Sequence, residues 1–208
     1  MNLNMYSFDQ LGLPSFLVDT IEKLGYKEPT EVQAKAIPKA LEGSNIIGLS
    51  QTGTGKTAAF LLPIISSLSN GRSKARMPRS LVLCPTRELA AQVMENFENY
   101  SKNTRLTSAL LIGGVSFKDQ DKKLDRGVDI IIATPGRLLD QFERGKLMLT
   151  GVEFLAIDEA DKMLDMGFIP DITRILESLP SVKQKILFSA TIGKEIENLI
   201  SKSKTTNK

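Results

Sequence analysis

The chain has 208 residues, enough for one substantial domain with its own core or at most two small ones. Its formal net charge is +3, but the tail 201–208 carries three lysines, so the rest of the chain is neutral and any basic surface must be local. The chain contains no histidine and a single cysteine, which excludes zinc sites built on these residues, His-dependent catalytic triads and an internal disulfide.

The first 43 residues show helical patterns and no targeting signal. We expect helices within 14–25 and 30–43, because Gly25 is a typical C-terminal cap and Thr30 a typical N-terminal cap. The start of the chain lacks the basic and apolar regions of a signal peptide. The longest apolar run, interrupted by Pro63, is far shorter than the roughly 18 residues of a membrane span. We therefore expect a soluble, cytoplasmic protein.

From residue 45 onward, short β-rich runs alternate with helical patterns. The expected strands are "NIIGLS", "SLVLCP", "LTSALLIG", "DIIIAT", "FLAIDE" and "KILFSA", and the expected helices cover 55–67, 87–100, 117–126, 137–143, 169–179 and 194–201. The strands are rich in Val, Ile and Leu, as strands buried on both faces are. This pattern predicts an α/β fold with a mainly parallel central sheet and helices on both faces. Cys84 lies inside such a run and is interpreted as a buried hydrophobic residue.

The last residues of the chain are mostly polar. The tail 201–208 is too polar to pack and is expected to be disordered.

All six strand patterns end in small, polar or charged residues. In open parallel sheets ligands bind outside the carboxyl ends of the strands, so these clusters are the candidate functional residues.

The stretch "GLSQTGTGKTAAF" at 48–60 is typical of a phosphate-binding loop. Backbone N–H groups of 52–57 would surround a β-phosphate at a helix N-terminus, Lys56 would neutralise the β- and γ-phosphates, and the Thr57 hydroxyl would bind Mg²⁺. Ser50 stands where the general motif has its first glycine. The alternative is an ordinary glycine-rich turn, but strand, turn and helix occur in the required order.

The stretch "FLAIDEAD" places Asp158 and Glu159 at the end of a buried strand. There, Asp158 would hold Mg²⁺ through its water shell and Glu159 would polarise the attacking water. An exposed acidic turn, or the first turn of a helix, is the alternative interpretation.

Several further motifs leave two interpretations open. Residues 30–33 read T-x-x-Q, a capping box, yet the Gln33 carboxamide could also pair with the N6 and N7 edge of adenine. "TPGR" at 134–137 is a good helix start, "GG" at 113–114 could be a flexible turn, and "SAT" at 189–191 could be a helix cap.

Taken together, these segments resemble the DEAD-box family of ATP-dependent RNA helicases, specifically the first of its two RecA-like domains. The resemblance covers about residues 8–200 and rests on Phe8 followed by "GYKEPTEVQ", "SQTGTGKT", "PTRELA", "GG", "TPGR", "DEAD" and "SAT", in family order. Ser50 in place of the commoner alanine and Tyr26 in place of phenylalanine are mild departures. The implied organisation is an N-terminal helical segment with an adenine-reading Q motif (1–43) packed on a RecA-like, P-loop domain (44–200).

The resemblance implies roles for individual residues. Catalysis would rest on Lys56, Asp158 and Glu159, with Mg²⁺ held by Thr57 and, through water, by Asp158. The ATP-binding residues would be Phe8, Lys27, Thr30, Gln33, Ser50, Gln51, Thr52, Gly53, Thr54, Gly55, Lys56 and Thr57. The backbone of RNA would lie along Pro85, Thr86, Arg87, Gly113, Gly114, Thr134, Pro135, Gly136 and Arg137. Asp161, Ser189 and Thr191 would link the nucleotide state to domain closure.

The resemblance also implies a partner. Family members carry a second RecA-like domain whose arginines reach the γ-phosphate, and the 17 residues after Thr191 contain no arginine. We therefore expect a monomeric, membrane-free domain that binds ATP, Mg²⁺ and RNA without base specificity but, alone, hydrolyses ATP poorly and does not unwind RNA. A stand-alone binding module for RNA or protein, and a P-loop ATPase acting on DNA or protein, are the competing hypotheses.

Overall fold

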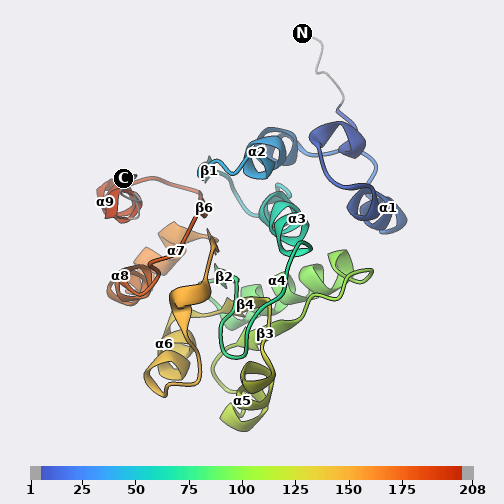
Figure 1. The fold of residues 1–208 in the computed structure, drawn as a ribbon. Helices are drawn as coiled ribbons and strands as arrows, with labels where there is room; N and C mark the ends of the chain where they lie inside the picture. Colours follow the sequence, from blue (N-terminus) through green and yellow to red (C-terminus); the bar gives the residue numbers. More distant parts are fainter. Residues whose placement is uncertain (1–5, 203–208) are drawn as a thin grey trace.

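The structure is a computed structural model that describes residues 6–202. In chain order its elements are η1 (Phe8–Leu11), α1 (Ser15–Lys23), α2 (Glu31–Leu41), β1 (Ile46–Leu49), α3 (Lys56–Leu68), β2 (Ser80–Leu83), α4 (Arg87–Tyr100), β3 (Ser108–Leu111), α5 (Phe117–Arg126), β4 (Ile130–Ala133), α6 (Pro135–Glu143), η2 (Leu149–Gly151), β5 (Phe154–Ile157), α7 (Ala160–Asp165), α8 (Ile169–Glu177), β6 (Gln184–Ser189) and α9 (Lys194–Lys202). Figure 1 shows helices arranged around a central sheet.

The sheet of the described residues has six strands, all parallel, in the order β1-β6-β5-β2-β4-β3. The register places Leu49 opposite Ser189, and Leu83 opposite both Ile157 and Ala133. The carboxyl ends of β2, β3, β4 and β5 are therefore level, and β1 and β6 extend two residues further along the same edge of the sheet. This confirms the predicted parallel α/β fold and gathers the polar clusters that follow the strands.

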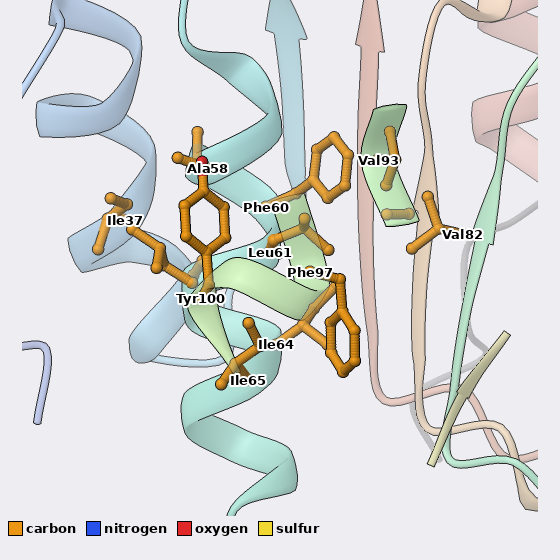
Figure 2. Close-up of a cluster of buried hydrophobic side chains, with 14 of the residues drawn as sticks. Ile37, Ala58, Phe60, Leu61, Ile64, Ile65, Val82, Val93, Phe97 and Tyr100 are labelled. Atoms are coloured by element: carbon orange, nitrogen blue, oxygen red, sulfur yellow. The ribbon is translucent and has the colours of Figure 1, made fainter. Parts of the chain in front are cut away.

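Two apolar cores cover the two faces of the sheet. One contains side chains of α1 to α4, and the other contains side chains of α5 to α9. Figure 2 shows part of the first core, where Phe60, Leu61 and Ile64 of α3 lie among side chains of α2, α4 and β2. Helix α3 is apolar nearly all round, and full burial of such side chains contributes about 1.5–3 kcal/mol each.

The N-terminal segment belongs to the same structural unit. Leu17 and Ile21 of α1 and Ile37 of α2 are fully buried in the core that also contains α3 and α4. Gly25 adopts φ +91°, and the Tyr26 N–H donates to the Ile21 carbonyl at 3.0 Å, so α1 ends in the expected glycine-capped turn.

Some elements differ from those expected. The short helices η1 and η2 have no counterpart in the sequence prediction, and a helix near α7 was only the alternative interpretation of "DEAD". Helix α6 begins two residues earlier than expected, at Pro135. Helix α9 continues to Lys202, so the first two residues of the predicted disordered tail are helical; residues 203–208 lie outside the described part. Within residues 6–202, no helix combines the length and apolar character that crossing a membrane requires.

Candidate nucleotide and RNA site

The loop between β1 and α3 has the backbone of a phosphate-binding loop. Gly53 and Gly55 have φ of +84° and +83°, values that residues with a Cβ rarely adopt. At Gly55 a Cβ would also lie 2.5 Å from Gln33 Nε2 and 2.8 Å from Thr30 Oγ1. Helix α3 begins directly after Gly55 and no side chain caps it, so its first N–H groups are free to bind an anion.

Lys56 joins this loop to the acidic residues that follow β5. Its Nζ lies 3.1 Å from Asp158 Oδ1 and 3.4 Å from Glu159 Oε1, and the side chain is only 6% exposed. The Thr52 hydroxyl donates to Glu159 Oε1 at 3.2 Å. The two acidic residues therefore face the phosphate loop, with Thr57 the next residue after Lys56.

Asp158 is the most deeply buried charged group of the site, with no exposed surface. Neither of its carboxylate oxygens has a well-formed hydrogen bond within the described residues. Burial raises the pKa of Asp158 above its usual value, and the ammonium of Lys56 partly offsets that effect. A buried carboxylate whose only charged partner within residues 6–202, besides Glu159, is the Lys56 ammonium suits a cation.

The same residues fit a hydrated Mg²⁺. In residues 6–202 no group of three His, Cys, Asp or Glu side chains could enclose a metal ion. Mg²⁺ usually binds through one or two carboxylates and keeps several waters and phosphate oxygens as its other ligands. Asp158 provides one carboxylate for such a set, and Thr57, the residue after Lys56, stays the predicted second ligand.

Glu159 has an unusual backbone. Its φ of 53° and ψ of 54° lie in the left-handed region, where it forms the N-cap of α7. Such a conformation costs roughly 1–3 kcal/mol for a residue other than glycine, and it often occurs at functional sites. Helix α7 begins at the next residue, Ala160, so the interpretation as a first helical turn holds for Asp161 but not for Asp158 and Glu159.

Asp161 is linked to the residues that follow β6. The Asp161 N–H donates to Ser189 Oγ at 3.1 Å, and the Ser189 hydroxyl donates to the Thr191 carbonyl at 2.6 Å. The Thr191 hydroxyl donates to Asp161 Oδ2 at 3.5 Å. "SAT" therefore does not cap α9, which begins at Lys194.

The phosphate loop, the acidic segment and the segment after β6 enclose one cavity of about 260 Å³. Its lining residues are Ser50, Thr52, Lys56, Glu159, Asp161, Lys162, Asp165 and Ala190. Lys162 and Asp165 had no signal in the sequence that marked them for this cavity.

Gln33 serves the capping box and contacts the phosphate loop as well. Its Oε1 accepts from the Thr30 N–H at 3.0 Å, and its Nε2 donates to the Gly55 carbonyl at 3.1 Å. Phe8 is 2% exposed and its ring meets Tyr26 edge-on at 6.2 Å, whereas Lys27 is exposed. It stays a prediction that Gln33, Thr30 and Lys27 recognise adenine and that Phe8 packs on the base. Packing on a base would require the Phe8 ring to become more accessible than it is here.

Most of the predicted RNA-binding residues line a second cavity of about 450 Å³ beside the first turns of α4 and α6. Seven of them do so: Pro85, Thr86, Arg87, Gly113, Thr134, Gly136 and Arg137. Thr86 caps α4 by accepting from the Leu89 N–H at 3.2 Å, whereas Thr134 occupies the N-cap position of α6 without a side-chain bond. Gly114 and Pro135 do not line this cavity. Four residues that the prediction of RNA-binding residues omitted do line it, namely Glu88, Asp140, Met166 and Phe168.

Arg137 is held by contacts within the protein. Its guanidinium lies 4.1 Å from the centre of the Phe117 ring and donates to the Val115 carbonyl at 2.9 Å. Arg144 lies 4.2 Å from the same ring. The Arg137 side chain is only 12% exposed, so it mainly fixes the loop that follows Gly114.

The chain matches the sequence profile of the DEAD/DEAH box helicases over residues 30–199. It belongs to this family. It is 45% identical to a protein of Dictyostelium discoideum named "Probable ATP-dependent RNA helicase ddx27", with 93% of this chain and 25% of that protein aligned. It is 44% identical to "ATP-dependent RNA helicase DeaD" of Buchnera aphidicola, with 93% of this chain and 32% of that protein aligned.

Solved structures give the same result for the fold. A DEAD box protein from Methanococcus jannaschii is 38% identical and superposes with a TM-score of 0.89, covering 97% of this chain and 55% of that one. A hypothetical ATP-dependent RNA helicase from Sulfolobus tokodaii is 39% identical with a TM-score of 0.85, covering 94% of this chain and 56% of that one. The chain thus spans about a quarter to two fifths of the curated DEAD-box relatives it matches.

Proposed function

We propose that this chain is the ATP- and RNA-binding domain of a DEAD-box RNA helicase, in which ATP hydrolysis drives local opening or remodelling of RNA duplexes. The activity of the whole helicase would require a second RecA-like domain. The relatives' names support this proposal, since they are called ATP-dependent RNA helicases.

The observation that carries the proposal is the contact of Lys56 with Asp158 and Glu159. It joins the loop that would bind the phosphates to the carboxylates that would serve hydrolysis, at 3.1 and 3.4 Å. When a triphosphate enters, Lys56 would exchange these carboxylates for phosphate oxygens. Bound Mg²⁺ would supply charge neutralisation at the phosphates. Glu159 would then be free to accept a proton from the attacking water.

The lining of the phosphate cavity supports slow hydrolysis by this domain alone. Within the described residues its cations are Lys56 and Lys162, and no arginine lines it. An arginine that reaches the transition state contributes on the order of 10³ to 10⁵ in rate in nucleotide hydrolases. The link from Asp161 to Ser189 and Thr191 would transmit the presence of the γ-phosphate to a second domain.

The groove beside α4 and α6 supports binding of the RNA backbone. Its lining includes small residues, two helix N-termini and two arginines, beside the carboxylates of Glu88 and Asp140. The helix N-termini can donate N–H groups to phosphates without selecting a base. Binding at such a groove would depend strongly on salt concentration, because phosphate contacts dominate it.

The test is nucleotide binding by this chain, measured by calorimetry and thermal unfolding with ATP, ADP and GTP, with and without Mg²⁺. ATP at about 100 times its Kd would stabilise the fold by about 2.7 kcal/mol. That corresponds to a rise of roughly 5–10 °C in Tm for a chain of this size. GTP would give a smaller rise.

Two variants make the test specific. Lys56→Ala would abolish the ATP-dependent rise, whereas Lys39→Ala, which removes an exposed lysine of α2, would keep it. A chain that binds RNA tightly but no nucleotide at all would instead be a stand-alone binding module, and the proposal would be wrong.

A further inference from the structure

A cavity of about 610 Å³ lies at the opposite end of the strands from the sites described above. Two of its lining residues mark the start of strands: Asp129 directly precedes β4, and Leu106 lies two residues before β3. The RNA groove follows the carboxyl ends of these same strands. The strands β3 and β4 have four residues each, so the cavity and the RNA groove are separated by the length of a strand, roughly 13 Å, and by the loops at its two ends.

The uncompensated charge of this cavity is positive. Its one lining carboxylate, Asp129, is buried, lies 3.2 Å from Arg79 Nη2 and accepts from the Thr107 N–H at 3.0 Å. Arg72 and Arg105 also line the cavity, and both are exposed and lack an ion-pair partner within residues 6–202.

The helix ends around the cavity favour an anion as well. The C-terminus of α3 borders it, but Arg79 donates to the Leu68 and Asn70 carbonyls and so offsets the partial negative charge of that helix end. The N-terminal turn of α1, with a partial positive charge and no side-chain cap, contributes Phe16 to the lining.

The remaining lining suits a nucleotide better than a simple ion. Phe16 and Leu106 form an apolar wall. The neighbouring Asn103 amide and Thr104 hydroxyl donate within the protein, to Thr20 Oγ1 and to the Ser101 carbonyl. Arginine matches phosphate geometry, and an aromatic side chain can stack on any base. The volume lies within the usual range of about 300–1,000 Å³ for ligand pockets. An acidic peptide would use the arginines but not the aromatic wall.

We propose that this cavity, defined by Arg72, Arg105 and Phe16, binds a nucleotide of a single-stranded RNA segment that flanks the part held in the groove. This inference rests on the proposed RNA-binding function. The two arginines bind the phosphate and Phe16 contacts the base, so the contact lacks base specificity. It extends the length of RNA that one domain holds.

The experiment uses the whole chain and a photo-crosslinkable single-stranded RNA of about 20 nucleotides, longer than the 4–16 nucleotides typical of one single-strand site. The test variant is Arg72→Ala/Arg105→Ala. The control is Lys39→Ala/Lys183→Ala, which removes the same formal charge from exposed lysines outside both RNA-binding regions.

The test variant should bind this RNA about three- to tenfold more weakly, and the slope of log affinity against log salt should fall by about 0.7, the value for one lost phosphate contact on a single strand. Crosslinks to 101–107 should disappear, while those to the groove remain. Arg72→Lys/Arg105→Lys keeps both charges and should keep most of the salt slope, which separates a lost contact from a folding defect.

Other results would overturn the inference. Crosslinks confined to the groove, or an equal loss of affinity in the control, would mean that the cavity does not bind RNA. Loss of binding to a poly-glutamate peptide with unchanged RNA binding would assign the cavity to an acidic protein partner. If the unaltered chain crosslinked RNA at the cavity but not at the groove, the RNA path in the proposed function would be wrong and this inference would stand.

Discussion

Replacement of Gly55 by alanine tests how the N-terminal segment is attached to the phosphate loop. At φ +83° an alanine costs about 1–2 kcal/mol. Its Cβ would also lie 2.5 Å from Gln33 Nε2, which must move and lose its bond to the Gly55 carbonyl, at a cost of about 1 kcal/mol. We expect Gly55→Ala to lower the free energy of unfolding by about 2–3 kcal/mol and to weaken ATP binding.

Gly43→Ala is the matched control. Gly43 has φ +84°, and nothing lies within 4 Å of the position of its Cβ, so it carries the backbone cost without the contact. The effect of alanine on the unfolded chain is common to both variants and cancels in the comparison. In urea unfolding, Gly55→Ala should lose at least about 1 kcal/mol more than Gly43→Ala.

A double variant completes this test. Gln33→Ala removes one of the atoms that the new Cβ would contact. The double variant Gln33→Ala/Gly55→Ala should therefore lose less free energy of unfolding than the sum of the losses of the two single variants. Equal losses for the two glycine variants, together with full additivity, would refute the idea that this contact joins α2 to the phosphate loop.

Three further predictions concern the rest of the site. Burial raises the pKa of Asp158, so this carboxylate becomes protonated at a higher pH than an ordinary aspartate does. As the pH is lowered, the Mg²⁺-dependent part of the ATP affinity, measured by calorimetry, should therefore decrease. Asp158→Asn should remove this pH dependence. Burial, followed by the negative charges of Asp158 and Glu159, raises the pKa of Cys84. A thiol reagent should therefore modify Cys84 only after the chain is unfolded by urea, and rapid modification of the native chain would contradict its placement. Phe117→Ala removes the ring on which the Arg137 guanidinium lies. Since such stacking contributes about 0.5–2 kcal/mol, this variant should bind RNA about three- to tenfold more weakly and keep its ATP affinity. A parallel loss of ATP affinity would indicate a general folding defect.

The fold could be predicted from the sequence because its local signals agree with one another. Continuous apolar runs marked the buried strands, and helical patterns between them required parallel crossovers. Helices α4 and α5 begin and end at the predicted residues, since Thr86 and Ser116 cap them and Gly127 ends α5. The capping box of Thr30 and Gln33 is present as predicted.

Other features had no local signal. The left-handed backbone of Glu159 is imposed by the surrounding structure, because glutamate does not favour that region, and α7 begins there as a consequence. Met166 and Phe168 reach the RNA groove only through the path of the chain after α7. The internal contacts of Arg137 arise from α5, whose packing against α6 no spacing in the sequence indicates.

The strand order also bears on how the protein is made. Strand β1 carries the phosphate loop and emerges early from the ribosome, but its neighbour within the described sheet is β6, about 140 residues later in the chain. Pairing over such a separation is slow, because the entropy of closing the intervening loop is lost first. A nascent chain that lacks β6 therefore lacks the strand that pairs with β1, and the proposed nucleotide site is completed only after β6 has been made.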